Sequence, residues 1–504
     1  MSAATRGASR APGAGRARAT WIGLLTIALT AVSGCGLRVG AGQVGAATLQ
    51  AEGRGSSAGP TGGGGLGGVT VSPDASASAG PSASGSASTA SGSGPASGSN
   101  GLAGSNALAG SPLAATSTPA PAGGNGGATA PGVTATTITV GNVSDLGGPV
   151  PGLFQGGPYG AEAYFDYVNS LGGVYGRQLK LISSDDQLEC NQNEADYQNL
   201  VSSVFAFVGS WSLDDNCGAQ VMAAHPSVPL VQEQLTPQAA ALPSAYSEAP
   251  FGQGAALGPF EYYKSVAPGA ITAVGTLVGN QPAAVQAWKY SQAAMDSLGY
   301  KVIYEDDFNP AQSNFTADVV RMRSQGVKMV YLIALNAPDA AIFSAEAAQQ
   351  GFHPQLWACA VCYFGGYVSE SGGAANVNGQ YLNVGSALFL GDPSVPEVPL
   401  YLKWLAKAAP GFSPDQFSAY SWADAALFVH ALSQAGTHLT QKAVDAALAA
   451  TNQFTDNGMM APAGIGAKKP SNCYLMLQIQ NGSFTKVGDP ASGFLCNAPY
   501  YSAG

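Results

Sequence analysis

A long stretch near the start of the chain cannot build a hydrophobic core. Residues 36–131 consist mainly of Gly, Ser, Ala, Pro and Thr, and the only charged residue between Gly55 and Thr137 is Asp74. Such a composition buries too little apolar surface to offset the entropy of ordering the backbone. We therefore expect residues 35–131 to form a disordered tether, with a reach of roughly 50–60 Å for a flexible coil of this length.

The segment before the tether has the layout of an export signal. A basic segment precedes an apolar stretch at residues 21–32, and small residues follow up to Cys35. The apolar stretch is shorter than the roughly 20 residues of a membrane-spanning helix and is typical of a secretory signal. Its end resembles a bacterial lipobox. This implies a signal peptide at residues 1–34 and a lipidated Cys35 that anchors the chain to the extracytoplasmic face of the bacterial membrane; an ordinary cleaved signal is the alternative.

Charge and motif content exclude several classes of function. The chain carries 30 Asp and Glu against 20 Lys and Arg, a net charge of −10. An acidic surface repels nucleic acid, and no basic patch with interleaved aromatic residues opposes this conclusion. The globular part contains no GxSxG or HExxH motif, and its four histidines are scattered. We therefore expect neither an enzyme nor a bound metal or cofactor.

Seven cysteines, one of them Cys35, leave six for the globular part. An even number in an exported chain indicates disulfides, and six cysteines allow 15 connectivities. Proximity along the chain favours Cys190 with Cys217, Cys359 with Cys362, and Cys473 with Cys496. The pair Cys359 and Cys362 also has the spacing of a redox motif, although no helix is expected to begin there.

The globular part alternates between two periodicities. Strands are expected at residues 138–140 and 179–181, with an amphipathic helix between them that ends at Gly172-Gly173. Strand, helix and strand within this short span indicate a βαβ unit with parallel pairing. Apolar runs at residues 204–208 and 228–231 are typical of strands that are buried on both faces.

A second α/β series follows the first. The pattern predicts strands at 271–278, 301–304 and 327–335, helices near Trp288–Gly299, 317–325, 400–408 and 423–435, and a closing hairpin around Asn481-Gly482. Two such series exceed what one hydrophobic core usually accommodates, which indicates two lobes.

Short motifs recur through the globular part in a fixed order. They are Gly132-Val133-Thr134, Gly147-Gly148-Pro149-Val150, Val168 to Gly176, Asp185-Asp186, Val208-Gly209-Ser210, Phe315-Thr316-Ala317-Asp318 and Tyr420 to Ala426. In this order they resemble the type I periplasmic binding proteins, specifically the branched-chain amino-acid (Leu/Ile/Val) receptors of ABC transporters. The resemblance covers essentially all of residues 132–496.

The resemblance implies an α/β fold of two Rossmann-like lobes joined by three hinge strands. Lobe 1 would comprise about 132–250 and 390–455, and lobe 2 about 256–385 and 460–500 of a domain spanning 132–504. It also implies a monomer, a small-molecule ligand that is captured by hinge closure, and ABC-transporter permease subunits as partners. A receptor that signals to a membrane kinase uses the same clamp, and the sequence does not separate the two functions.

The ligand is expected at the carboxyl ends of the parallel strands. These ends are the loops after Val140, Val208, Val231, Val278, Leu335 and Trp357. The candidate ligand contacts in or near them are Phe154, Ser210, Trp211, Ser212, Gln234, Thr236, Asn280, Asn336, Ala360, Tyr363 and Trp422. Cys190 also matches the disulfide position of the family's first lobe, while Cys217 lies about five residues later than the usual partner, so the Ser210–Cys217 loop is expected to be remodelled.

The family's amino-acid site needs a carboxylate that pairs with the ligand's ammonium, because an unpaired buried ammonium is costly. The resemblance places that acid at Ala360, and it places expected aromatic contacts near Leu335 and Ala284. The alternative acids are Glu233, Asp339, Asp214 and Asp215. We therefore expect a small, mainly apolar ligand, with amino acids as the largest single class.

Overall fold

The computed structural model describes residues 118–310, 312–387, 389–390, 394–488 and 493–503. The predicted signal peptide, Cys35 and most of the predicted tether lie outside these residues. No helix in the described ranges combines the length and the apolar character needed to cross a membrane.

The first sheet is fully parallel and is built from the first α/β series. Its five strands follow the order β2-β1-β3-β4-β5, so that β1 lies between β2 and β3. Its elements are β1 (Thr137–Ser144), α1 (Gly156–Ser170), β2 (Gln178–Asp185), α2 (Cys190–Leu200), β3 (Phe207–Val208), α3 (Asp215–Ala223), β4 (Leu230–Val231), α4 (Pro237–Ala240) and β5 (Ala245–Tyr246).

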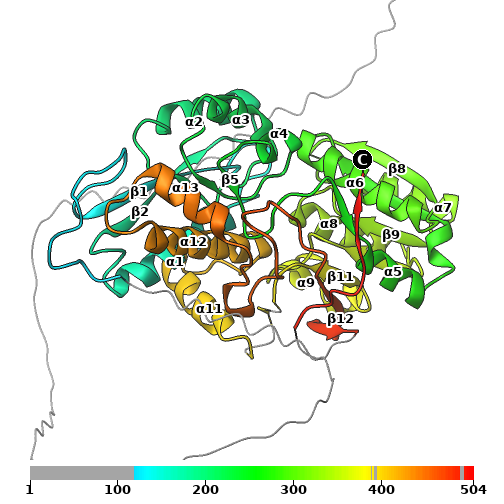
Figure 1. The fold of residues 1–504 in the computed structure, drawn as a ribbon. Coiled ribbons are helices and arrows are strands. Elements are labelled where there is room, and N and C mark those ends of the chain that lie inside the picture. The colour runs from blue at the N-terminus through cyan, green and yellow to red at the C-terminus, as the bar shows by residue number, and fades with distance from the viewer. Residues whose placement is uncertain (1–117, 311, 388, 391–393, 489–492, 504) are drawn as a thin grey trace, which may run out of the picture. The chain divides into compact units, whose positions relative to one another are not determined.

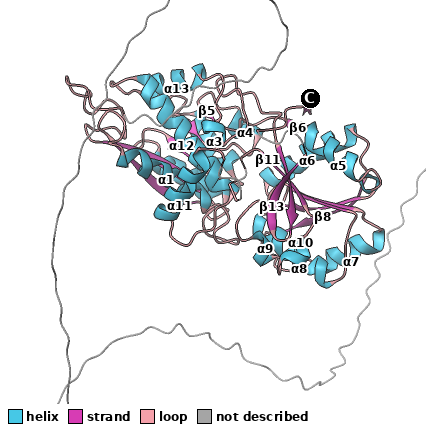
Figure 2. Ribbon diagram, turned by 90° about the horizontal axis from the view of Figure 1, so that it is seen from below, coloured by secondary structure: helices cyan, strands magenta, loops and turns pink. Residues whose placement is uncertain are grey.

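The second sheet has seven strands in the order β13-β12-β11-β10-β9-β7-β8 and is parallel except at β12 and β13. Figure 2 shows α5 and α6 on one side of this sheet and α7 to α10 on the other. The elements of this series are β6 (Gly254–Ala256), α5 (Leu257–Val266), η1 (Ala270–Thr272), β7 (Val274–Gly279), α6 (Pro282–Ser297), β8 (Val302–Phe308), α7 (Thr316–Gln325), β9 (Met329–Leu332), α8 (Ala337–Gln349), β10 (Leu356–Cys359), α9 (Tyr367–Glu370), α10 (Ala374–Val377) and β11 (Tyr381–Val384).

The chain passes three times between the two sheets. After β5 it leaves the first sheet for β6, and after β11 it returns to form helices that pack against α1 and β3. After the last of these helices it enters the second sheet again. The remaining elements are α11 (Glu397–Ala408), α12 (Gln416–Ala435), α13 (Gln441–Ala450), η2 (Asp456–Gly458), β12 (Leu475–Gln480), β13 (Ser483–Val487) and β14 (Tyr500–Ser502). Figure 1 shows α11 and α12 beside α1, with α13 against α12.

These features confirm the expected α/β fold with two parallel series. The hairpin between β12 and β13 turns at Asn481 and Gly482, whose φ angles of 52° and 81° are those that Asn and Gly tolerate best. Strand lengths are less well predicted. The apolar run at residues 204–208 yields only the two-residue strand β3, and Val204 and Phe205 are instead buried before it.

The start of the domain differs from the composition-based expectation. We expected the tether to continue to residue 131, yet the buried Arg177 side chain donates hydrogen bonds to the carbonyl oxygens of Asn125 (2.5 Å) and Gly127 (3.0 Å). It also donates to Thr134 O at 2.8 Å. A buried guanidinium needs acceptors for its fixed set of donors. The hydrogen bonds from Arg177 therefore hold residues 125–127 against the globular domain.

Candidate functional site

A cavity of about 310 Å³ lies at the carboxyl ends of strands from both sheets. Segments after β1, β3 and β4 meet segments after β7, β9 and β10 around it. Its lining residues are Leu153, Phe154, Trp211, Leu213, Gln234, Leu235, Phe251, Gly279, Gln281, Ala283, Ala284, Ala287, Phe308, Pro310, Ile333, Ala334, Leu335, Asn336, Ala360, Val361, Gln416 and Phe417. The position agrees with the general location of ligand sites in open α/β sheets.

Three aromatic side chains form one wall of the cavity. The ring centroids of Phe154 and Phe417 lie 4.8 Å apart, and Trp211 lies 5.5 Å from Phe154 and 4.9 Å from Phe417. Trp211 is fixed by two hydrogen bonds, from its backbone N to Ser144 Oγ (2.9 Å) and from Nε1 to Ser421 Oγ (2.9 Å). The wall is therefore a rigid apolar surface whose only polar edge is already satisfied.

Polar side chains in the cavity are all amides. Gln234 uses its Nε2 to donate to the backbone oxygens of Gln232 and Tyr246, and Asn336 caps α8 by accepting from Asp339 N at 2.8 Å. Gln281 and Gln416 stand at the first turns of α6 and α12. The first backbone N–H groups of a helix have no acceptor within the helix. The cavity thus offers amide groups and the uncapped N-terminus of α6, which suit a hydrogen-bond acceptor on a ligand; the first turn of α12 is already capped by Asp415.

No charged side chain is among the lining residues of the described chain. Of the four alternative acids, Glu233 is buried with Glu248 and Asp424, while Asp339 receives a hydrogen bond of 2.5 Å from Asn336 Nδ2. Burial raises the pKa of Asp339 to about 7, against the opposing effect of that hydrogen bond. Glu233 and Asp339 are thus engaged within the protein, and neither these two nor Asp214 and Asp215 line the cavity.

Asp215 is a further case, because it binds Thr236, one of the candidate ligand contacts. Thr236 Oγ1 donates to Asp215 Oδ1 at 2.6 Å, and Leu235 N donates to Asp215 Oδ2 at 2.6 Å. Burial raises the pKa of Asp215 to about 7. Thr236 also caps α4, so its hydroxyl group is used within the first lobe. The assignment of Thr236 as a direct ligand contact has no support in this geometry.

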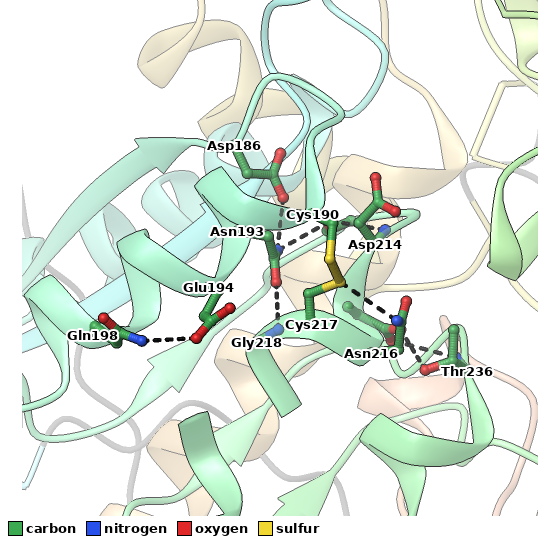
Figure 3. The surroundings of a disulfide bond; sticks show 12 residues. Asp186, Cys190, Asn193, Glu194, Gln198, Asp214, Asn216, Cys217, Gly218 and Thr236 are labelled. Atoms are coloured by element: carbon green, nitrogen blue, oxygen red, sulfur yellow. Dashed lines mark hydrogen bonds between the residues drawn. A yellow bond between two sulfur atoms is a disulfide. The ribbon is translucent and has the colours of Figure 1, made fainter. Parts of the chain in front are cut away.

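Two further candidate contacts, Ser210 and Ser212, lie in the segment after β3 and form hydrogen bonds within the protein. Figure 3 shows Asn193 between Asp186 and Gly218 next to the disulfide of Cys190 and Cys217. Asn193 Nδ2 donates to Asp186 Oδ2 (2.7 Å) and to Ser212 Oγ (3.1 Å). Ser210 Oγ accepts from Val143 N at 3.1 Å. Both serines therefore brace the loop and do not line the cavity.

Two predicted aromatic contacts are core residues. Tyr363 packs between Phe389 and Phe484, with ring centroids 4.4 and 4.9 Å away, and Trp422 is fully buried with its Nε1 donating to Glu397 Oε1 at 3.0 Å. Asn280 is exposed and does not line the cavity. The candidates that do line it are Phe154, Trp211, Gln234, Asn336 and Ala360.

All three cysteine pairs that proximity favoured are disulfides in the structure. The Cys359–Cys362 bridge closes the loop after β10, with the two Cα atoms 5.7 Å apart, and both sulfur-bearing side chains are fully buried. The two residues inside the loop, Ala360 and Val361, line the cavity. This disulfide therefore fixes a segment of the cavity wall.

Sequence reasoning missed several lining residues. Phe308 ends β8, Phe251 lies in the first crossing between the sheets, and Gln416 and Phe417 begin α12. The start of α12 had a detectable signal, because Asp415 and Ser418 form a capping box with Ser418 N donating to Asp415 Oδ1 at 2.7 Å. The sequence contains no comparable signal for Phe308 or Phe251.

Two α/β series joined by three crossings, with a cavity at the carboxyl ends of both sheets, define the class of two-lobed solute-binding proteins. The family model described as periplasmic binding protein matches residues 137–483, more than half of the chain. The chain belongs to this family, whose members bind solutes for ABC transporters, and it has the type I fold. No curated protein sequence matches the chain.

Solved structures share the fold at low sequence identity. The fatty acid ABC transporter substrate-binding protein from Thermomonospora curvata is 18% identical, with a TM-score of 0.61 over 73% of this chain and 95% of that one. A solute-binding protein from R. palustris in complex with benzoate is 14% identical, with a TM-score of 0.59 over 73% and 98%. The branched-chain amino acid transporter substrate-binding protein from Streptococcus pneumoniae in complex with isoleucine is 17% identical, with a TM-score of 0.56 over 70% and 100%.

Proposed function

We propose that this chain is an extracytoplasmic, lipid-anchored solute-binding protein that captures a small, mainly apolar ligand and delivers it to an ABC transporter. The observation that carries the proposal is the cavity, which is lined by alkyl and aromatic side chains and by four amides. Its volume of about 310 Å³ is at the lower end of the roughly 300–1,000 Å³ of small-molecule sites.

The cavity argues against a free amino acid as the preferred ligand. An enclosed ammonium group requires a counter-charge, and the position where the family resemblance places that acid is Ala360. Leu335 and Ala284 stand where aromatic contacts were expected, and all three of these residues line the cavity. Alkyl side chains at the three positions favour a ligand without an ammonium group.

The same lining favours a ligand with one polar end. The amides of Gln281 and Gln416 and the N-terminal turn of α6 can donate to a carbonyl or a carboxylate oxygen. Fatty acids and benzoate, which are named for two of the similar structures, are apolar bodies with such an end. The aromatic wall of Phe154, Trp211 and Phe417 would pack against the apolar body.

Anchoring and delivery rest on the sequence and on the family. Cys35 and the tether would hold the domain near the membrane, and closure of the two lobes around ligand would create the form that a permease recognises. A thermal-shift screen of the purified protein against short-chain acids, amides, aromatic acids, sugars and amino acids tests the ligand class. Stabilisation of about 2.7 kcal/mol is expected at 100 times the dissociation constant. A response to amino acids alone would contradict the proposed ligand class.

A further inference from the structure

A cluster of three buried carboxylates lies outside the cavity, next to two of the chain's crossings between the sheets. Glu233 follows β4, Glu248 follows β5, and Asp424 belongs to α12, and each offers a ligand oxygen within 4.8 Å of the others. All three side chains are buried, with exposures of 9%, 0% and 0%. The cluster therefore joins the end of the first sheet to the helix that packs on it.

No basic side chain of the described residues acts on the cluster. No Lys, Arg or His is among the groups that shift the pKa of these three carboxyl groups, and the ion pairs of Arg321 lie in the other series. Ser247 Oγ lies within hydrogen-bond distance of two of the carboxylates, and Tyr420 is near enough that Glu248 and Glu233 add to the effect of burial in raising its pKa. Three uncompensated carboxylates in a buried site are costly unless a proton or a cation is bound to them.

The hydrogen bonds around the cluster are too few for its oxygens. Ser247 Oγ lies 2.7 Å from both Glu233 Oε1 and Glu248 Oε2, yet a hydroxyl group has only one hydrogen to donate. Asp424 Oδ1 accepts from Glu248 N at 3.2 Å, whereas the buried Asp424 Oδ2 has no hydrogen-bond partner. An unpartnered buried carboxylate oxygen next to two further carboxylates indicates that a proton or a cation is bound there.

We propose that Glu233, Glu248 and Asp424 bind one divalent cation, with calcium as the best match. Calcium takes carboxylate and hydroxyl oxygens at about 2.3–2.6 Å, so oxygens on opposite sides of one ion are about 4.6–5.2 Å apart. The mutual separation of at most 4.8 Å in the cluster fits this span. The family's extracytoplasmic location places the site where weak calcium sites are used, with dissociation constants of roughly 10⁻⁴–10⁻³ M.

The bound ion would stiffen the crossings between the two sheets. It would connect the segment that leads from β5 to β6 with α12, and Tyr420 of the same helix accepts a hydrogen bond from Gly385 N (3.2 Å) in the second crossing. The cation site is thus placed to stabilise both crossings without contacting the ligand cavity.

The test is a metal titration of the full chain after treatment with EDTA, at pH 7.5, read by melting temperature and by native mass spectrometry. Calcium at roughly 1–10 mM should raise the melting temperature by several degrees, with one ion bound per chain. Glu248→Gln and Asp424→Asn should abolish this shift. Asp456→Asn is the matched control, because Asp456 is buried beside Glu397 at a separate site, and this variant should keep the response.

Two results would overturn the proposal. One is a wild-type protein that binds none of calcium, magnesium and manganese and whose melting temperature does not respond to them; the cluster would then be held by shared protons. The other is a calcium shift that persists in both Glu248→Gln and Asp424→Asn. Native mass spectrometry of the wild-type chain decides the first point even if a variant fails to fold.

Discussion

Trp211 Nε1 donates a hydrogen bond of 2.9 Å to Ser421 Oγ, so that α12 holds the largest aromatic side chain of the cavity. Ser421 Oγ in turn donates to Gly209 O at 3.1 Å. The contact links the loop after β3 to a helix more than 200 residues later in the chain (sequence separation 210). The shape of the cavity therefore depends on packing within the first series as well as on the lining residues themselves.

Ser421→Ala should lower both stability and ligand affinity. The substitution leaves the buried Trp211 N–H without an acceptor, which costs about 1–3 kcal/mol. Denaturant unfolding and calorimetry with a ligand from the screen measure the two effects. Ser344→Ala is the control, since it removes a buried hydrogen bond of 2.8 Å to Tyr367 away from the cavity. Equal affinities of the two variants would show that Trp211 does not depend on Ser421.

The segment before residue 132 should contribute to stability although composition places it in the tether. A chain that starts at residue 118 keeps the acceptors of Arg177 at Asn125 and Gly127, whereas a chain that starts at 132 loses them. Unpaired donors of a buried guanidinium should reduce the free energy of unfolding by about 1–3 kcal/mol or more. Denaturant melts of the two truncations compare them directly, and identical midpoints would contradict the expectation.

Stability should fall as pH rises from about 4 to about 7 in calcium-free buffer. Burial raises the pKa of Asp215 to about 7 and that of Asp415 to about 6, above the ordinary value of 3.8. A folded state that keeps its protons longer than the unfolded state is favoured below the ordinary pKa, and this advantage is lost as pH passes the folded pKa. Among the described residues, every carboxyl group with a shifted pKa has it raised, and burial is the largest cause in each case.

Melting temperatures at several pH values test this dependence. Asp415→Asn keeps the capping group of α12 but removes its titration, so the variant should show a shallower decline than the wild type. A melting temperature that rises steadily between pH 4 and pH 7 would refute the account of the buried carboxyl groups.

A charge placed at residue 360 should damage ligand binding. Ala360→Asp introduces a carboxylate between apolar lining residues, where desolvation is costly, and should weaken an apolar ligand at least tenfold, or about 1.4 kcal/mol. Ala360→Asn has the same size without the charge and should weaken binding less. Calorimetry on the two variants isolates the effect of charge, and equal losses would attribute the damage to size alone.

The sequence predicts the fold better than the site because strand and helix patterns are local. The turn at Asn481-Gly482 and the helix end at Gly172-Gly173 depend on backbone conformations that few residues adopt, and both are confirmed. Lobe topology follows from the order of the α/β units. The carboxyl ends of the strands are therefore predictable, and six of them border the cavity.

Individual contacts depend on partners that are distant in sequence. The sequence made Thr236 a candidate ligand contact, but its hydroxyl group donates a hydrogen bond to Asp215, 21 residues earlier. Trp422 and Tyr363 are aromatic, as in many binding sites, but an aromatic side chain near a predicted loop can equally well pack in the hydrophobic core. Phe417 was missed because only the complete helix α12 places it beside Trp211.

The most direct test of the proposed ligand class compares leucine with 4-methylpentanoate by calorimetry. The two molecules share the same alkyl chain and carboxylate and differ in the ammonium group. The uncharged cavity predicts that 4-methylpentanoate binds and that leucine binds at least tenfold more weakly, a difference of about 1.4 kcal/mol or more. Tighter binding of leucine would contradict the account, because it would require a counter-charge that the cavity lining does not contain.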